Sequence, residues 1–193
     1  MLLRDFHHFD HLSHQWISCR AGVAATEFAI IAPLLIFLFF GVVEGADALA
    51  RNRQVTLAVN TLVDLASQET DLLTADADDL FEGMEQIIDD DGAPISIRLV
   101  SVINDEDGDP VVHWSRDNEG NAPYAKGVAY DNLPAATLID PGASILVAEI
   151  SYAYTSKLSS LIIPPINFQT SATRWPRSSV RVQLCTSKSN CTS

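Results

Sequence analysis

A long apolar stretch dominates the hydrophobic pattern near the start of the chain. It runs from Val23 to Val43, and Glu27 is its only charged residue. An α-helix rises about 1.5 Å per residue, so about 20 residues cross the roughly 30 Å of hydrocarbon in a bilayer. The stretch therefore has the length of a transmembrane helix. A carboxylate is costly in hydrocarbon, so we expect Glu27 to have a partner and a function.

The helical pattern continues beyond the apolar stretch. Hydrophobic residues recur at roughly helical spacing up to Ala66, with charged and amide side chains between them. One long helix is predicted from about Gly22 to about Ser67, and its second part is expected to be a stalk. A second helix is predicted over 76–88, where apolar side chains share one stripe, and Gly92 lies just beyond its end.

From Pro94 onward the hydrophobic period changes to two, which is typical of half-buried strands. The acidic segment 104–109 separates two such runs and is predicted to be the turn of a hairpin. The predicted strands cover residues 95–103, 110–115, 144–155, 168–174 and 180–184. Two helices followed by an antiparallel sheet make an α+β fold. The Asn-, Gly- and Pro-rich segment 116–141 is predicted to be a long loop with a short helix near 133–138, and we expect partner-specific contacts there.

The charges that flank the apolar stretch indicate its orientation. Arg4 and Arg20 precede it, whereas Glu44 and Asp47 follow it, so the N-terminus is predicted to be cytoplasmic and everything beyond residue 44 extracytoplasmic. A secretory signal peptide is the alternative, because it also places basic residues before an apolar run. The run is longer than a typical signal peptide's, and no clear small-x-small cleavage site ends it.

The net charge argues against one class of partner. The chain has 12 Lys and Arg against 25 Asp and Glu, which gives a net charge of −13. The first 22 residues hold two of each sign, so the excess of acid belongs to the rest of the chain. Binding to nucleic acid is therefore not expected, because phosphate contacts need a basic face.

The segment around the lone acid resembles the processing site of type IV pilins, and more closely the TadE/TadG-like pseudopilins of tight-adherence (Flp) pilus systems. The matching elements, in order, are Arg20, Gly22, Ala24-Ala25, Glu27-Phe28-Ala29, Pro33, Leu34 to Phe40 and Gly41-Val-Val-Glu44. Weaker similarities to the same family follow at Val112 to Ser115, Ile145 to Tyr154 and Arg174 to Arg177.

The resemblance implies a role in pilus assembly. A prepilin peptidase would cut between Gly22 and Val23, and Glu27, followed by Phe28, would pair in the membrane with the new amino group of a neighbouring subunit. The implied partners are this peptidase, other pilins or pseudopilins and the pilus assembly platform. The implied location is the bacterial inner membrane, with a periplasmic C-terminus and possible incorporation into a pilus. The alternative is an uncut, single-pass anchored binding module in which Glu27 reaches the cytoplasmic interface.

These inferences divide the chain into five parts. They are a leader (1–22), a transmembrane helix (23–43), a stalk helix (44–70), an α+β head (71–184) and a C-terminal tail (185–193). Cys185 and Cys191 lie in an oxidising compartment under this topology and are predicted to form a disulfide that closes the tail, the alternative being two free thiols. Cys19 would remain a thiol on the cytoplasmic side.

Two groups of residues are candidate metal ligands. His7, His8, His11 and His14 lie at spacings that can share a helix face, but a polar cytoplasmic tail explains them more simply. Asp105, Asp107 and Asp109 crowd in the hairpin turn, yet an EF-hand register aligned on Gly108 places apolar residues at required ligand positions. No metal site is predicted, and a looser calcium site in the hairpin stays open.

Catalysis has little support in the sequence. Beyond the leader, His113 is the sole histidine, and it lies in a predicted strand next to Trp114. No nucleophile motif, phosphate-binding glycine loop or zinc-ligand set accompanies it. We therefore predict a non-enzymatic protein without a cofactor. A periplasmic hydrolase built from Asp and Glu alone is a further, weaker alternative.

Overall fold

The computed structural model describes residues 20–88, 92, 94–133, 139–140, 142–156 and 164–192. His7, His8, His11, His14, Cys19 and most of the predicted short helix at 133–138 lie outside these residues. The chain divides into two compact units, Met1–Asp47 and Ala48–Ser193.

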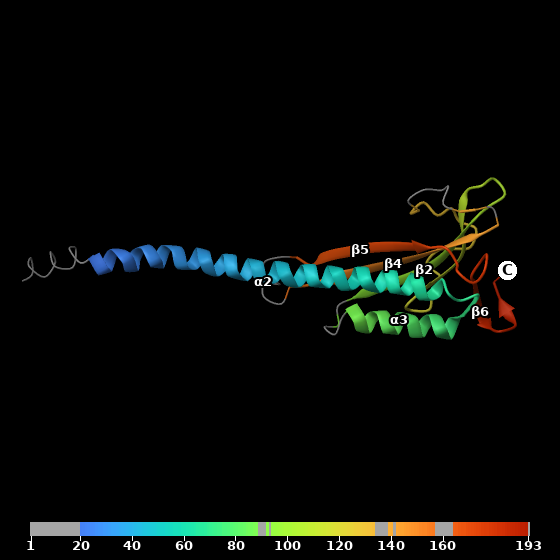
Figure 1. Ribbon diagram of the computed structural model, residues 1–193, viewed down its shortest axis with the longest axis horizontal. Helices are drawn as coiled ribbons and strands as arrows, with labels where there is room; N and C mark the ends of the chain where they lie inside the picture. Colours follow the sequence, from blue (N-terminus) through green and yellow to red (C-terminus); the bar gives the residue numbers. More distant parts are fainter. Residues whose placement is uncertain are drawn as a thin grey trace, which may run out of the picture. The chain divides into compact units, whose positions relative to one another are not determined.

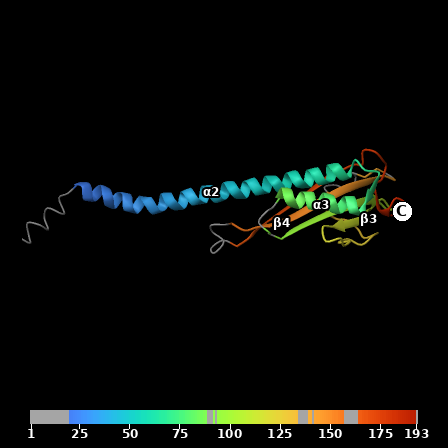
Figure 2. The same ribbon diagram turned by 90° about the horizontal axis from the view of Figure 1, so that it is seen from below.

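The described residues of the first unit form the N-terminal part of one long helix, α2 (Arg20–Ala66, 47 residues). Its large apolar side chains between Val23 and Val43 are all exposed, so this part of the helix has no protein core of its own. Pro33 lies inside the helix and removes one backbone hydrogen bond, and Figure 2 shows the blue N-terminal part of α2 curving. The predicted long helix is confirmed.

A four-stranded antiparallel sheet forms the centre of the second unit (Figure 1). Its strands, in spatial order, are β3 (Pro110–Asp117), β2 (Ile95–Asn104), β4 (Ser144–Tyr154) and β5 (Ile166–Arg174). β2 and β3 form the predicted hairpin around the acidic turn. The α+β architecture expected from the change of hydrophobic period is therefore confirmed.

A smaller sheet joins distant parts of the chain in the order β1-β6-β7. β1 (Asp71–Leu73) pairs in parallel with β6 (Gln183–Ser187), and β7 (Asn190–Cys191) pairs with β6. The strand predicted at 180–184 is thus wrong in its position. Val180 is 67 % exposed and its carbonyl accepts a hydrogen bond from the Ser144 amide outside any strand, so pairing begins only at Gln183.

The main core lies between the sheet and both helices. The last part of α2 runs alongside α3 (Thr74–Ile88), as Figure 1 shows, and both bury apolar side chains against one face of the sheet. Fully or nearly fully buried members are Val55, Val59, Leu62, Val63 and Ala66 of α2, Phe81 and Met84 of α3, and Ile97, Leu99, Leu146, Ala148 and Ile150 of the sheet. The end of the long helix is therefore one wall of the head's core.

The opposite face of the sheet holds a second, smaller core. Val100 and Val102 of β2, Val112 of β3, and Ile145 and Val147 of β4 bury their side chains there. The segment after β3 covers them with Tyr130 and Ile139. This segment also pairs with the outer edge of β3, through hydrogen bonds such as Val112 N–H to the Val128 carbonyl at 2.9 Å. The segment predicted to be a loop thus covers both an apolar face and a strand edge.

Two arginines connect the C-terminal part of the chain to the end of α2: Arg174 is the last residue of β5, and Arg177 follows the strand. Arg174 Nη2 donates to Asn60 Oδ1 at 3.2 Å, and the Arg177 guanidinium forms an ion pair with Asp64. The Arg177 amide donates to the Ser67 carbonyl at 2.8 Å, which satisfies a backbone acceptor just beyond the helix. These contacts hold the end of α2 next to the C-terminal segment.

Replacing Leu62 with Ala tests whether the end of α2 belongs to the head's core. Leu62 is 0 % exposed, so the change should lower the free energy of unfolding by about 2–5 kcal/mol. Leu57 lies on the same helix and is 65 % exposed, so Leu57→Ala is the matched control and should cost far less. Chemical denaturation of the full chain in detergent measures both. Equal losses would show that this helix does not pack as described.

Candidate functional site

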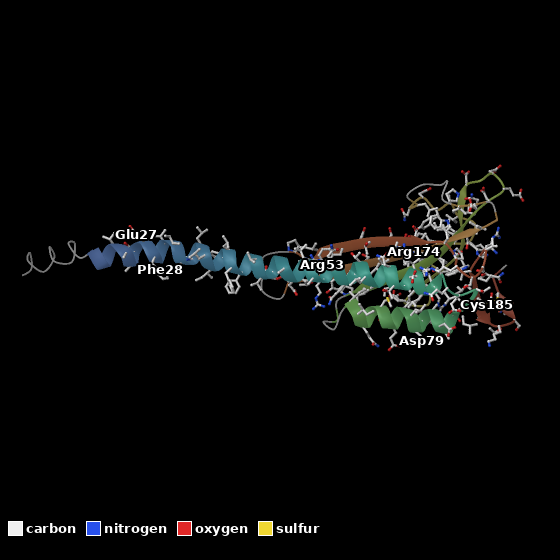
Figure 3. All side chains as sticks on the ribbon, viewed as in Figure 1. Glu27, Phe28, Arg53, Asp79, Arg174 and Cys185 are labelled. Carbon is white, nitrogen blue, oxygen red and sulfur yellow. A yellow bond between two sulfur atoms is a disulfide. The ribbon has the colours of Figure 1, made fainter. Side chains whose placement is uncertain are left out.

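The predicted processing-site residues all lie at the N-terminal end of α2. Gly22, Val23, Glu27 and Phe28 fall within its first turns, and Figure 3 labels Glu27 and Phe28 there. All four are exposed, and the Phe28 side chain is 68 % exposed. Glu27 has no hydrogen bond or ion pair with any residue whose side chain the structure describes. Its carboxylate is therefore available to a group from outside the described chain.

Gly22 has no structural reason to be glycine. A Cβ added there would meet no atom within 4 Å, and its φ angle is not in the left-handed region. A larger side chain therefore fits the helix at this position. A requirement for glycine at this position would come from a protein that binds the chain. A peptidase that needs close access to the backbone is one example.

The helix that carries these residues is suited to a membrane. It is the one helix in the described residues that is long and apolar enough to cross a bilayer, and its most apolar window has no buried residue. An exposed apolar surface of this length is costly in water, since each buried methylene is worth about 0.8 kcal/mol. A single-pass anchor is consistent with this helix, and Glu27 lies near its N-terminal end.

Cys185 and Cys191 form a disulfide between β6 and β7, where they are directly paired in the strand register. The Asp71 carboxylate lies close to both sulfur atoms, and the three residues form a potential metal-ligand cluster. Both sulfur atoms are already bonded to each other, so neither is a thiolate ligand. The disulfide links β6 to β7 and is a structural cross-link of the smaller sheet.

The acidic hairpin is explained by turn chemistry. Asp105 Oδ1 accepts hydrogen bonds from the amides of Asp107 at 3.0 Å and Asp109 at 2.8 Å. Gly108 has a φ of 91°, which a left-handed turn position requires. The Asp105 carboxylate therefore stabilises the turn, and the remaining carboxylates are exposed to solvent.

His113 is a buried residue of a β-bulge. Val112 pairs with Val102 and Trp114 with Ser101, so His113 is the extra residue between them. It is 3 % exposed, and neither ring nitrogen has a hydrogen-bond partner among the described residues. Burial, and to a smaller extent the positive charges of Lys126 and Arg181, lowers the pKa of the imidazole below 6.5. The neutral form of the imidazole is thus favoured.

A hydrogen-bond network centred on Glu149 was not predicted from the sequence. The Glu149 carboxylate accepts from Tyr130 Oη at 2.5 Å, from Tyr124 Oη at 2.8 Å and from Asn132 Nδ2 at 3.3 Å. Arg98 Nη1 lies 3.8 Å from it. The Arg98 guanidinium also lies 6.0 Å from the centre of the Tyr124 ring, which is favourable for a cation–π contact.

The environment of this network keeps both phenols protonated. Desolvation, followed by the hydrogen bond to Glu149 and its charge, raises the pKa of Tyr130 and of Tyr124. Each hydroxyl is therefore a fixed donor to the carboxylate. One feature of the sequence could have indicated this network: each of two apolar strands contains a single charged residue, Arg98 in β2 and Glu149 in β4. The sheet register places these two residues opposite each other.

Comparison with known proteins gives a match at the N-terminal helix. Residues 22–63 match the family model described as TadE-like protein, a segment that begins at the predicted scissile glycine and covers most of α2. The resemblance to this family that the sequence indicates is confirmed over this segment. No curated protein and no solved structure matches the chain.

The pH dependence of stability tests the state of His113. The pKa of His113 is lowered in the folded protein, so below about pH 6.5 the unfolded chain binds more protons than the folded chain. The free energy of unfolding therefore decreases as the pH is lowered, until the pH passes the folded-state pKa. Relative to His113→Leu, the wild-type protein should lose up to about 1.4 kcal/mol per pH unit in this range. Urea denaturation between pH 7.5 and 5.5 measures the difference. Parallel pH profiles would contradict a buried, neutral imidazole.

Proposed function

We propose that this TadE-like chain is a minor pseudopilin that is anchored in the bacterial inner membrane and takes part in assembling a tight-adherence pilus. The observation that carries the proposal is the match of residues 22–63 to the TadE-like family, because the match begins at Gly22 and includes the apolar stretch from Val23 to Val43 with its single acid. The chemistry that the protein undergoes is peptide cleavage by a prepilin peptidase, and the protein itself is not an enzyme.

In this proposal, residues 1–22 are a cytoplasmic leader and residues 23–43 cross the membrane. The remaining chain lies in the periplasm, where the disulfide between Cys185 and Cys191 is chemically expected. Cleavage between Gly22 and Val23 is compatible with the fold, because a Cβ added at Gly22 would meet no atom within 4 Å. A substitution of Gly22 should therefore affect the protease and leave the helix intact.

Cleavage gives Glu27 a partner. It creates an amino group on Val23, and a neighbouring pilin or pseudopilin presents the same kind of group at the same membrane depth. An ion pair between the Glu27 carboxylate and the neighbour's amino group removes the cost of an isolated charge in hydrocarbon. Phe28, exposed on the next position of the helix, is available for apolar contact with that neighbour. Subunits are thereby aligned before they join the filament or its base.

Replacing Gly22 with Val tests the processing step. In cells that contain the cognate prepilin peptidase, the wild-type chain should be recovered from membranes starting at Val23, and Gly22→Val should retain its leader. Gly41→Val is the matched control, because Gly41 also lies in α2 with no atom within 4 Å of an added Cβ, and it should be cut normally. Intact mass and N-terminal sequencing give the result. A wild-type chain that keeps its leader favours the uncut binding module instead.

Replacing Glu27 with Gln tests the pairing step separately. The change keeps the shape of the side chain and removes its charge, so the protein should still enter the membrane while pilus formation falls sharply. Thr26→Val is the matched control, because it alters the preceding residue of the same turn without changing any charge, and it should leave pilus formation intact. Electron microscopy of sheared pili and membrane fractionation measure both outcomes. Normal pilus formation by the Glu27→Gln variant would refute the proposed pairing.

A further inference from the structure

One part of the sheet face that points away from the helices is polar. Arg98 pairs with Glu149 and Glu149 with Ser171 across three neighbouring strands, and Ser96, Ser151 and Gln169 form the next row. Directly paired residues in antiparallel strands point to the same face. Because Ile97 and Ile150, which alternate with these residues, are buried in the main core, both polar rows face the other way.

These rows form the floor of a groove with a volume of about 440 Å³. Tyr124 and Asn132, from the segment after β3, form a wall beside it. This volume lies within the range of about 300–1,000 Å³ that is typical of small-molecule sites. The groove lies entirely within the second unit, separate from the processing-site residues.

The wall and the floor differ in how their polar groups are used. Tyr124 and Asn132 both donate to Glu149, so the wall is held in place. By contrast, four uncharged side chains of the floor form no hydrogen bond with any described residue; they are Ser96, Ser151, Gln169 and Ser171. The groove therefore offers uncommitted donors and acceptors next to a pre-organised edge, as binding sites require.

The charges of the groove select the ligand. Arg98 and Glu149 are the charged residues that line it, and they lie 3.8 Å apart, so their fields largely cancel. The chain's net charge of −13 disfavours an anionic ligand, and the half-exposed Arg98 disfavours a cation. β2 and β4 use their backbone groups in ladders with neighbouring strands on both sides, so a peptide main chain finds no pairing on that part of the floor.

We propose that this groove binds a neutral saccharide. Each sugar hydroxyl both donates and accepts hydrogen bonds, which matches a floor of serine hydroxyls with the Gln169 amide, and Arg98 and Glu149 supply one fixed donor and one fixed acceptor. The volume accommodates a mono- or disaccharide unit of a longer glycan, because the groove is open to solvent. This site is independent of cleavage after Gly22 and of pairing by Glu27.

A glycan array probed with the full chain in nanodiscs, made from lipids without sugar headgroups, tests the proposal. Binding to one or more neutral glycans, followed by saturable titration with the corresponding free saccharide, is the expected result. Inorganic phosphate and glucuronate serve as anionic probes, and neither should compete. Failure to bind any neutral glycan, or preferential binding of the anionic probes, would overturn the proposal.

Variants on β5 then locate the site. Gln169→Val and Ser171→Val remove hydrogen-bonding groups but suit an exposed strand, so the thermal midpoint should change little. Each should weaken saccharide binding by about tenfold, the value of one lost hydrogen bond to the ligand. Gln183→Val, in β6 and outside the groove, is the matched control and should bind as the wild type does. Binding that survives both β5 variants would place the ligand elsewhere and refute the proposal.

Discussion

The structure depends on one helix that has to satisfy two different surroundings. The N-terminal part of α2 exposes apolar side chains on all sides, and the carboxylate of Glu27 is the one charge among them. Its last turns bury Val55, Leu62 and Ala66 against a sheet and expose residues such as Leu57. A helix that is apolar all round suits lipid, whereas a helix with one apolar face suits the surface of a protein core. The change between these patterns along one helix separates the proposed anchor from the head.

The head uses its polar side chains in two ways. Arg174, Arg177 and the Trp114 indole, which donates to the Val182 carbonyl at 2.8 Å, fasten the C-terminal segment to the helix and the sheet. Glu149 collects donors from a long connecting segment and so fixes the position of that segment on the sheet. Buried polar groups are expensive when unpaired, so such networks specify one arrangement of the elements they join.

The two candidate sites lie in different parts of the chain. The predicted processing segment begins the stretch that matches the family model and contains a lone acid, whereas the groove is formed by polar side chains of the head's own sheet. A fold alone does not determine a function, and here no solved structure matches the chain. In our proposals the anchor supplies the general chemistry of pilus assembly, and the head supplies recognition. An anchor of a shared type joined to a separate head allows these two properties to vary independently.

The sequence by itself determined the features that depend on local periodicity and composition. These are the long helix, the second helix, the acidic hairpin, and the strands of the main sheet to within a few residues, because a repeat of 3.6 or of two is visible within a short window. Only the tertiary structure decided which distant residues meet: the parallel pairing of Leu72 with Leu184, the bulge that buries His113, and the register that places Arg98 opposite Glu149. Strand register and the burial of α2 follow from packing between segments far apart in the chain, and a local pattern carries no information about that partner.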